Sequence, residues 1–376
     1  MRTVSRPTLL FIVHSWGGGT IRYARELAEL VAPQAKVVFA WGVENRTFYI
    51  SERDPEQPDQ SFDLAKGLGQ PVQALSGLGV CRADVICTIG FQNYIDELLE
   101  RLAIPFDATL LDYHHFSVAP HFEDSSGHFI GDAMVSVLAA AMRKSNVLPP
   151  VLRRAERRIA CSGDLALRAS QFIPEFPILP VRFPEREDPD RIVPVVEPLV
   201  EGEPMRVLVL GRIAPQKGLD IVRDVAAMLK AKGLPIQIVC LGEFSVSPDV
   251  LPVSFHVKFL GKFNQSELQP IVRRLRPHVA WLPFTIPETH SFALSDVMRL
   301  RLPVLATGIG AVPERVQGRA ATWLVPLEQG IAAHFVRWLE RLYADRLESP
   351  PHWLPIGHLP PRSQQFYQRN YLNPAA

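Results

Sequence analysis

The strongest constraint on the fold of this chain is that strand-like and helix-like stretches alternate along it in two separate runs. Short apolar stretches predict strands in the first half at Thr8–Val13, Val37–Trp41, Val85–Ile89, Thr109–Leu111, Arg158–Cys161 and Ile178–Val181. In the second half strands are predicted at Val207–Leu210, Ile236–Leu241, Val257–Leu260, Val279–Leu282 and Pro303–Ala306. Predicted helices include Ile21–Val31, Tyr94–Leu102, Ile221–Ala231 and Gln269–Arg276. This alternation predicts an α/β architecture in which helices cover both faces of parallel sheets.

Chain length and one proline-rich segment predict two domains. At 376 residues the chain is longer than one ordinary α/β layer requires. Residues 186–204 are rich in proline and acidic side chains, a composition typical of a linker. We therefore expect Rossmann-like domains at residues 1–185 and 205–355. A C-terminal tail, residues 356–376, follows them and is expected to contain a last helix that returns to the N-terminal domain.

The composition is that of a globular protein and excludes several function classes. Hydrophobic residues make up 47% of the chain and charged residues 21%. The net charge of +1 gives no electrostatic reason to expect nucleic acid as a partner. Four cysteines lack the spacing of a zinc site, so we expect reduced thiols. The apolar start, Leu9–Val13, is shorter than a signal-peptide core, and no stretch approaches the roughly 18 to 20 apolar residues of a membrane span. We therefore expect a cytoplasmic protein.

Two carboxylates stand eight positions apart, at Glu288 and Asp296. Glu288 is expected on the loop after a strand, and Asp296 about one turn inside a helix predicted at Phe292–Leu300. The start of that helix would offer backbone N–H groups as a seat for a phosphate. One carboxylate would hold sugar hydroxyls and the other a ribose, with the diphosphate between them. The alternative is a loop Glu and a solvated helix Asp without function. The residues that we expect to bind substrate at the helix start are His290, Ser291 and Phe292.

The segment that contains these carboxylates, Pro287–Glu314, resembles the donor-site motif of family 4 (group 1) glycosyltransferases. That motif reads Glu-x7-Glu, followed by a turn of small residues and a Pro-Glu pair. The stretch PETHSFALS is similar to bacterial members that build surface polysaccharides. Asp296 stands where the second Glu is usual and keeps a carboxylate that is one methylene shorter. The resemblance implies that Glu288 contacts the donor sugar and Asp296 the ribose.

A second segment, GRIAPQKGLDIV at residues 211–222, resembles the family pattern Gly-Arg-x4-Lys-Gly-x-Asp. The resemblance implies that Arg212 and Lys217 clamp the nucleotide diphosphate. A leaving nucleoside diphosphate gains negative charge as the glycosidic bond breaks, and a fixed guanidinium and ammonium group would stabilise it. Asp220 is expected to support the next helix. The segment is not a Walker loop, because the required Gly-Lys-Ser/Thr is absent.

Three glycines, Gly17, Gly18 and Gly19, connect the first predicted strand to the first predicted helix. Glycines at such a junction let the backbone approach a ligand closely. The segment resembles the family's Gly-Gly-Gly-Thr-Glu-Arg, with Ile21 in place of the Glu, so a polar role at that position is lost. His14, just before this loop, is either a packed strand-end histidine or a ligand contact.

The acceptor side is expected in PFDATLLDYHHFSVAP, residues 105–120. This segment resembles the family's His-Asp-Tyr segment, with Leu111 at the His position and Asp112 and Tyr113 matching. His114 and His115 follow at once. Asp112 and His114 are the candidates for orienting the attacking hydroxyl of an acceptor. The alternative is a capping Asp and a surface His pair.

Two further motifs are interpreted as having no catalytic role. Asp188-Pro189-Asp190 spells the metal-binding Asp-x-Asp of a different glycosyltransferase fold, but it lies in the linker, and we expect a solvated charge run there and no essential metal. Gly308-Ile309-Gly310 follows a predicted strand, but Pro313 stands where a dinucleotide fingerprint requires Gly or Ala.

A basic cluster follows the apolar stretch Ala133–Met142. Such a combination is found where proteins contact an anionic membrane, here one that would carry a lipid-linked acceptor. The more common explanation is a solvated helix face. The cluster consists of Arg143, Lys144, Arg153, Arg154, Arg157 and Arg158.

Together the motifs predict the GT-B architecture, with two Rossmann-like domains that face a central cleft. The predicted function is a retaining, metal-independent glycosyltransferase that moves a sugar from a nucleoside-diphosphate sugar to a glycan or lipid-linked acceptor. Peripheral contact with the inner face of a membrane is part of this hypothesis. The alternative is a degenerate, non-catalytic homologue that binds nucleotide or carbohydrate beside an active partner enzyme. A sugar-nucleotide epimerase is a third and more distant hypothesis.

Overall fold

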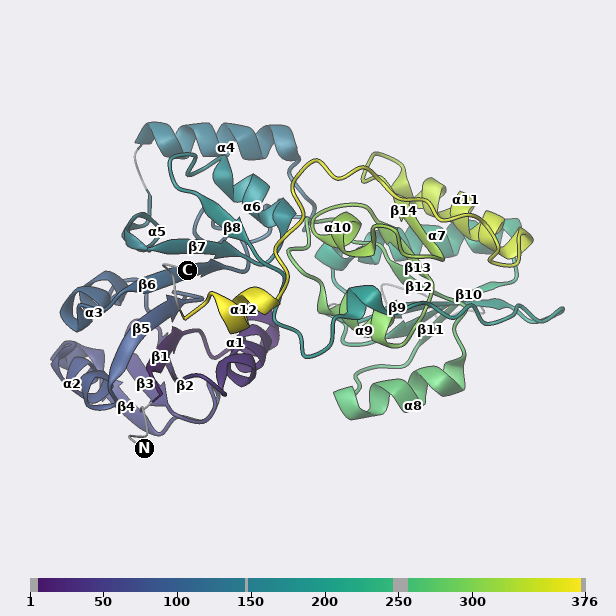
Figure 1. The fold of residues 1–376 in the computed structure, drawn as a ribbon. Helices are drawn as coiled ribbons and strands as arrows, with labels where there is room; N and C mark the ends of the chain where they lie inside the picture. Colours follow the sequence, from purple (N-terminus) through teal and green to yellow (C-terminus); the bar gives the residue numbers. More distant parts are fainter. Residues whose placement is uncertain (1–5, 146–147, 246–255, 373–376) are drawn as a thin grey trace. The chain divides into compact units, whose positions relative to one another are not determined.

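The computed structural model describes residues 6–145, 148–245 and 256–372. The chain divides into two compact units (Figure 1). The first comprises Met1–Val118, Asp132–Glu187 and His358–Ala376, and the second comprises Ala119–Gly131 and Asp188–Gly357. Among the described residues, no helix combines the length and the apolar character needed to cross a membrane.

The first unit is built on one eight-stranded sheet with the order β4-β3-β2-β1-β5-β6-β7-β8. In this order, the strands β2, β1, β5, β6, β7 and β8 run parallel to one another. The strands β3 and β4 pair antiparallel and form one edge of the sheet. The strands are β1 (Thr8–Ile12), β2 (Lys36–Val43), β3 (Thr47–Ser51), β4 (Gln60–Asp63), β5 (Val80–Val85), β6 (Phe106–Leu110), β7 (Arg157–Ala160) and β8 (Ile178–Pro180). The helices are α1 (Gly18–Val31), α2 (Gly69–Gly77), α3 (Ile95–Leu102), α4 (Asp132–Ser145), α5 (Pro150–Arg154), α6 (Gly163–Ser170) and α12 (Gln365–Arg369).

The second unit contains a six-stranded, fully parallel sheet with the order β11-β10-β9-β12-β13-β14. Its strands are β9 (Met205–Leu210), β10 (Ile236–Leu241), β11 (Val257–Phe259), β12 (Val279–Leu282), β13 (Val304–Thr307) and β14 (Thr322–Val325). Its helices are α7 (Leu219–Lys232), α8 (Gln265–Leu275), α9 (Phe292–Arg299), α10 (Val312–Val316) and α11 (Ile331–Ala344).

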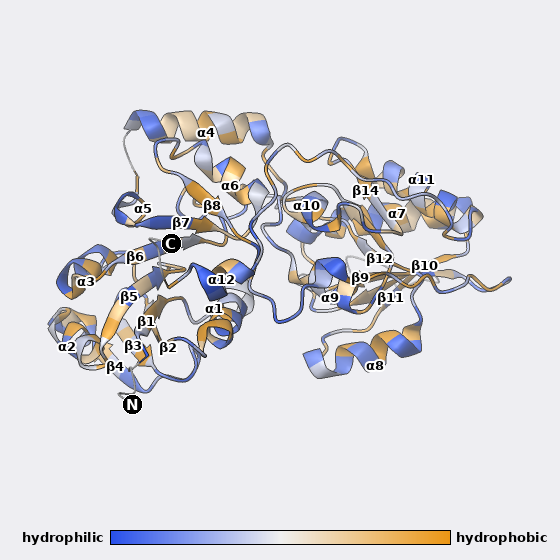
Figure 2. Cartoon of the chain, in the orientation of Figure 1, coloured by the Kyte–Doolittle hydropathy of each residue, from blue (hydrophilic) through white to orange (hydrophobic). Residues whose placement is uncertain are grey.

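Helices cover both faces of this sheet because successive side chains of its strands point to opposite sides. On β9, Val207 and Val209 pack into a core that α7 and α11 complete. Leu208 and Leu210, which alternate with them, pack into a second core shared with α8 and α9. Figure 2 shows the matching amphipathic character of α7, α8 and α11, which carry hydrophobic and hydrophilic residues side by side. The expected α/β fold with two parallel sheets is therefore confirmed.

The predicted strand Val85–Ile89 is misplaced, because the observed strand β5 occupies Val80–Val85. This strand carries two charged residues, Arg82 and Asp84, which are buried in the sheet. Charges inside a buried strand require partners, and here neighbouring strands supply them. Arg82 donates to both carboxylate oxygens of Asp107 on β6, at 2.7 and 3.1 Å. The predicted stretch Val85–Ile89 has no charged residue and therefore looked more like a strand than Val80–Val85 does, but it leads out of the sheet.

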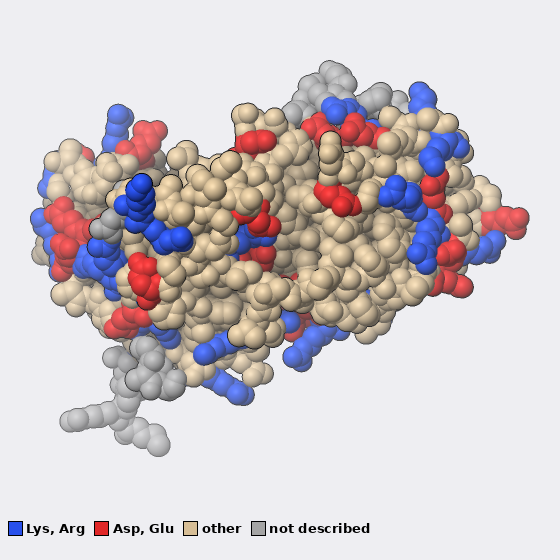
Figure 3. Space-filling view, turned by 90° about the horizontal axis from the view of Figure 1, so that it is seen from above, with Lys and Arg blue, Asp and Glu red and all other residues tan. Residues whose placement is uncertain are grey.

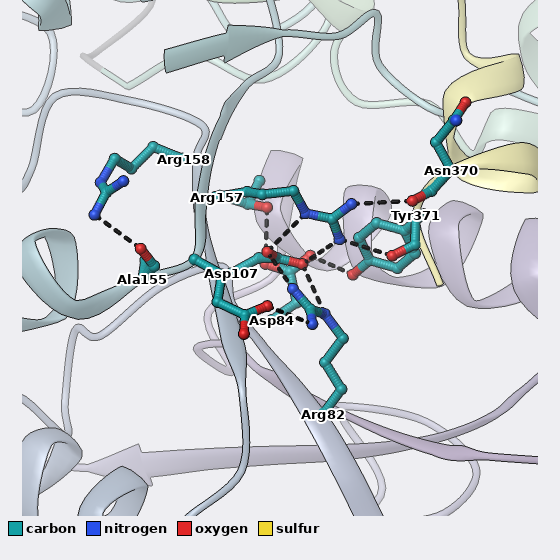
Figure 4. A network of polar contacts seen from close by, with 10 residues as sticks. Arg82, Asp84, Asp107, Ala155, Arg157, Arg158, Asn370 and Tyr371 are labelled. Atoms are coloured by element: carbon teal, nitrogen blue, oxygen red, sulfur yellow. Dashed lines mark hydrogen bonds and ion pairs between the residues drawn. The ribbon is translucent and has the colours of Figure 1, made fainter. Parts of the chain in front are cut away.

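The same buried network anchors the C-terminal tail to the first unit (Figure 4). Arg157 on β7 pairs with Asp107 and donates to the carbonyl oxygens of Asn370 and Tyr371 at 3.0 and 2.7 Å. The Tyr371 hydroxyl donates to Asp84 at 2.5 Å. Burial raises the pKa of Asp84 to about 7, and the nearby Asp107 charge adds to the effect. The tail after α11 therefore ends in contact with the sheet of the first unit.

Candidate functional site

The candidate donor residues lie where the strand order of the second sheet reverses. From β9 the chain moves first to β10 on one side, and later to β12 on the other side of β9. Ligands of parallel α/β sheets bind outside the carboxyl ends of the strands at such a switch point. The loop after β9 carries Arg212 and Lys217, and the loop after β12 carries Glu288. The topology therefore brings together segments that lie about 70 residues apart in the sequence.

Lys217 and Glu288 are in direct contact. The Lys217 ammonium group forms an ion pair with Glu288 Oε1. The Glu288 side chain is only 9% exposed, whereas that of Lys217 is 32% exposed. Lys217 Nζ also lies 5.2 Å from the centroid of the Phe284 ring, within the range of a cation–π interaction. A partly exposed cation whose position is fixed by a buried carboxylate is suited to bind an anionic ligand.

Two glycines allow the backbones around this ion pair to pack closely. Gly218, directly after Lys217, has φ of +84°, and a Cβ there would lie 1.9 Å from the Pro283 carbonyl oxygen. Gly310 has φ of +66°, and a Cβ there would lie 2.3 Å from the Glu288 carbonyl oxygen. The same Glu288 carbonyl accepts a hydrogen bond of 2.7 Å from Ala311 N–H. Gly310 therefore supports Glu288, a role that the sequence analysis did not assign to it, because it weighed this turn as part of the family motif and as a dinucleotide fingerprint.

The start of α9 is fixed by its own cap and by Arg315. Ser291, with φ of +67°, caps the helix by accepting a hydrogen bond from Leu294 N–H. Arg315 Nη1 donates to the carbonyl oxygens of His290 and Ser291 at 2.8 and 3.1 Å. The His290 and Phe292 rings meet edge to face, with centroids 5.0 Å apart. The three residues predicted at this helix start are thus held in a defined arrangement beside Glu288.

Asp296 is not the solvated helix residue of the alternative interpretation. Its side chain is only 9% exposed. It accepts a hydrogen bond of 3.1 Å from Gln265 Nε2 at the start of α8, and Arg299 Nη1 lies 3.3 Å away. Gln265 is a neighbour that the sequence analysis did not single out. The contact between Asp296 and a ribose stays a prediction. The structure shows that two side chains, Gln265 and Arg299, already orient this carboxylate.

Arg212 lies at the end of β9 and is exposed. Its charge adds to the effect of Lys262, whose hydrogen bond is the main cause that lowers the pKa of Glu243. Arg212 therefore stands in a charged surface region, whereas Lys217 lies in the half-buried ion pair. Of the two predicted diphosphate ligands, the geometry gives Lys217 the more defined position.

The Asp188-Pro189-Asp190 segment is not the solvated charge run that we expected. It forms a short 3-10 helix, Pro189–Arg191, in the second unit. Asp190 accepts hydrogen bonds from Arg315 Nη2 and Nε at 2.8 and 3.1 Å, and both side chains are less than 10% exposed. Because Arg315 also holds the start of α9, Asp190 acts on the candidate site through that guanidinium. Asp188 caps the short helix by accepting from Asp190 N–H.

A hairpin from the first half of the chain packs on the donor loops of the second unit. This 119–131 hairpin contains an antiparallel bridge between Glu123 and Phe129. Phe129 N–H donates to the Thr285 carbonyl oxygen at 3.0 Å. The Thr285 hydroxyl lies 3.2 Å from the Gly127 carbonyl oxygen and 3.0 Å from that of Pro215. The hairpin therefore buttresses both loops that carry Lys217 and Glu288, and no motif in the sequence pointed to it.

The glycine loop of the first unit has the geometry that its sequence predicts. Gly17 and Gly18 have φ of +72° and +73°, values that favour glycine. The site of a Cβ at Gly18 has no atom within 4 Å, so the backbone there is open. Ile21, which replaces the family's Glu, is buried in the core at 1% exposure. The substitution therefore serves packing of α1.

The acceptor-side candidates of the first unit form a compact polar cluster after β6. Asp112 Oδ1 accepts from His114 N–H at 2.9 Å and lies 2.5 Å from His114 Nδ1. The rings of His114 and His115 lie against each other at a tilt of 39°, with centroids 3.8 Å apart. Complete burial lowers the pKa of His115 well below 6.5, with a smaller contribution from His114. Burial likewise lowers the pKa of His14, while the Asp112 charge opposes that shift.

The interpretation as a surface His pair is therefore wrong. Asp112 does cap its own turn, but it also fixes the His114 ring, and His115 is buried. Within the described part of the chain, Nε2 of His114 and Nε2 of His115 are buried without a hydrogen-bond partner. Buried polar atoms of this kind are uncommon in structural sites and occur where a ligand or water completes the bonding.

Comparison with known proteins identifies the domain type. Residues 204–345 match the family model described as glycosyl transferases group 1. No curated protein matches the chain. The matches to solved structures extend over nearly the whole chain and establish the GT-B fold, as the motifs predicted, and residues 204–345 carry the predicted group 1 glycosyltransferase domain.

Three of these structures illustrate the similarity. Anabaena HepE, crystallised with UDP, is 14% identical with a TM-score of 0.56, over 91% of this chain and 92% of that chain. A glycosyltransferase from Rickettsia africae is 13% identical with a TM-score of 0.58, over 90% and 88%. The catalytic domain of starch synthase IV from Arabidopsis thaliana, bound to ADP and acarbose, is 12% identical with a TM-score of 0.56, over 92% of each chain.

Proposed function

We propose that this chain, whose second unit carries a group 1 glycosyltransferase domain on a GT-B fold, transfers a sugar from a nucleoside-diphosphate sugar to an acceptor. The observation that carries the proposal is the contact between Lys217 and Glu288 at the switch point of the second sheet. One group is suited to a diphosphate and the other to sugar hydroxyls. Two of the similar structures contain a nucleoside diphosphate, UDP in one and ADP in the other, which supports this substrate class.

The donor residues have distinct roles in this proposal. Lys217 and Arg212 stabilise the negative charge that develops on the leaving nucleoside diphosphate. Glu288 accepts hydrogen bonds from the donor sugar, and Asp296 accepts them from the ribose. The start of α9 places backbone N–H groups near the diphosphate. Lys217 and the start of α9 are held by contacts within the protein before the substrate arrives, so these hydrogen-bond donors require little reorganisation as charge develops.

The acceptor hydroxyl is oriented by residues of the first unit. Asp112 and His114 hold each other through the 2.5 Å contact, and the open glycine loop at Gly17–Gly19 follows β1 of the same sheet. A carboxylate–imidazole pair can accept a proton from an attacking hydroxyl. We infer a glycan or lipid-linked acceptor, retention of configuration and no requirement for a metal ion. These inferences rest on the motif resemblance and on the cationic donor side.

A second candidate is a non-catalytic homologue that binds nucleotide or carbohydrate beside an active enzyme. The observations in its favour are Ile21 in the core and Leu111 in place of the family's histidine. The two candidates separate in one experiment. A panel of nucleotide sugars is incubated with the protein, with and without lipid and glycan acceptors, and released nucleoside diphosphate is measured. Acceptor-dependent release supports the transferase. Nucleotide binding without release from any donor supports the binding homologue.

A further inference from the structure

Helix α4 presents an apolar surface to solvent. Of its fourteen residues, only Val135 and Ala139 are buried. Met134, Val137 and Leu138 are 48%, 60% and 36% exposed. They share a stripe with exposed Ala141 at the spacing i, i+3, i+4 and i+7, so they lie on one side of the helix. A solvated helix normally carries charged side chains on its outer face. The outer face of α4 therefore fits a non-aqueous neighbour.

The charges on α4 lie at its two ends, with one acidic residue in the first turn and two basic residues in the last turn. Its single acidic residue, Asp132, is ion-paired with Arg168 of α6. Its last turn carries Arg143 and Lys144, both exposed. Figure 3 is seen from the side on which α4 lies in Figure 1, and it shows uncharged surface with lysine and arginine side chains beside it and scattered acidic groups. The helix thus combines an exposed apolar stripe with a basic end.

The members of the basic cluster expected from the sequence have different environments in the structure. Arg157 turns into the sheet and pairs with Asp107. Arg158 is buried, donates to the carbonyl oxygens of Leu152 and Ala155, and lies over the Phe176 ring. These two arginines support the fold and have no place in a surface contact. Arg143 and Lys144 are the members of the cluster that share α4 with the apolar stripe.

From this juxtaposition we propose that the exposed face of α4 docks on an anionic lipid surface. The apolar side chains Met134, Val137 and Leu138 enter the boundary between headgroups and acyl chains, and Arg143 and Lys144 contact the lipid headgroups. We assign an anionic lipid surface as the partner because its charge is complementary to this face. The outer face of α4 is apolar and basic, and its one acidic residue is neutralised by Arg168. The proposal does not depend on transferase activity, because docking requires no donor sugar.

Vesicle co-sedimentation tests this surface. The protein is mixed with large vesicles of phosphatidylcholine, either pure or with phosphatidylglycerol, at low and high salt. We expect binding to the anionic vesicles that weakens with salt. Val137→Asp should reduce this binding by roughly tenfold or more, because it places a charge in the apolar contact. Lys144→Gln should reduce it by about fivefold.

A matched control is available on the second unit. Met228 on α7 is 39% exposed, so Met228→Asp makes the same kind of change outside α4 and should leave vesicle binding unchanged. Thermal unfolding and far-UV circular dichroism confirm that each variant is folded. Wild-type protein that does not co-sediment with anionic vesicles overturns the proposal, as does equal loss in Met228→Asp. So does an α4-dependent dimer in sedimentation analysis, which would assign the face to a second copy.

Discussion

Lys217 and Glu288 form an ion pair although 71 positions separate them in the sequence. In the absence of substrate, the cation assigned to the diphosphate is neutralised by the carboxylate assigned to the sugar. An arriving nucleoside-diphosphate sugar would give each group a new partner, a phosphate for Lys217 and hydroxyls for Glu288. The pair therefore keeps the Glu288 charge compensated in the empty site, where an isolated buried carboxylate would be costly.

Replacing Lys217 by Ala should weaken nucleoside diphosphate binding by roughly 1.5 to 3 kcal/mol, the range for a hydrogen bond to a charged group. Isothermal titration calorimetry measures the change. Lys230→Ala, which removes an exposed lysine from α7, is the matched control and should bind as the wild type does. Equal affinity of Lys217→Ala and wild type would remove the diphosphate site from this loop.

Glu288→Gln and Asp296→Asn should have different effects. Glu288→Gln keeps the shape but removes the charge next to Lys217, so nucleoside diphosphate affinity should be maintained or increased. Its kcat should fall, because the proposed function places this carboxylate on the sugar, where the bond breaks. Asp296→Asn should weaken binding of the free nucleoside diphosphate, since a ribose contact exists with or without the sugar. Calorimetry and steady-state kinetics give both quantities. The reverse pattern would show that the two carboxylates have exchanged roles.

Gly310→Ala should disable the site through the backbone of Glu288. The new Cβ would lie 2.3 Å from the Glu288 carbonyl oxygen, so this residue has to move. Gly318→Ala is the control, because Gly318 has a similar φ of +77° but open space around its Cβ position. Both variants carry the cost of a left-handed conformation, about 1 to 2 kcal/mol. We expect turnover to fall by roughly 100-fold in Gly310→Ala relative to Gly318→Ala. Equal activities would mean that Gly310 has no part in placing Glu288.

The sequence predicted those parts of the fold and site that depend on local patterns. Strands β10 and β12 were predicted with the bounds that the structure shows, because β12 is an uninterrupted apolar run and β10 is apolar except for Gln237. The loops that carry Lys217 and Glu288 were found because each follows a predicted strand and contains a motif of defined spacing, GRIAPQKG in one and the Glu288–Asp296 pair in the other. The contact between these two side chains follows from the strand order, in which β9 and β12 are neighbours.

Other features depend on contacts between distant segments and have no local signature. Strand β5 was misplaced because the partners that allow its charges, Asp107 and Tyr371, lie far along the chain. The edge strands β3 and β4 were not predicted, and neither was β14. Thr285 gave no signal, because its role depends on the 119–131 hairpin. Asp190 was taken for a solvated residue because its partner, Arg315, is 125 positions away.

Activity should survive treatment with EDTA, because the proposal assigns the leaving-group charge to Lys217, Arg212 and the start of α9. A variant of Asp190 tests the same conclusion through stability. Asp190→Asn breaks the buried ion pair with Arg315 and should lower the free energy of unfolding by about 3 kcal/mol, in the presence or absence of chelator. Thermal unfolding and turnover are measured with EDTA and after adding Mn²⁺ or Mg²⁺. Turnover that disappears with EDTA and returns with metal would contradict both the metal-independent mechanism and the structural role of Asp190.

The anchor of the C-terminal tail should make stability depend on pH. The pKa of Asp84 is raised to about 7 in the folded protein, against an unfolded value near 4. The folded state therefore holds more protons than the unfolded state in this window, so the contribution of Asp84 to stability is lost as the pH rises from about 4 to 7. The asparagine of the Asp84→Asn variant does not titrate. The difference in Tm between this variant and wild type should therefore shift in favour of the variant as the pH rises from 5 to 8. Parallel melting curves across this range would argue against a protonated Asp84.

The 119–131 hairpin has a consequence for protein engineering. The second unit is encoded in two separate pieces of the gene, because this hairpin precedes the rest of its unit by more than fifty residues. A chimaera that exchanged this unit with that of a relative by joining the genes at the 186–204 linker would combine the hairpin of one parent with the Lys217 and Glu288 loops of the other. Thr285 would then face foreign carbonyl groups. A graft that includes both pieces would carry the native support of the donor loops with it.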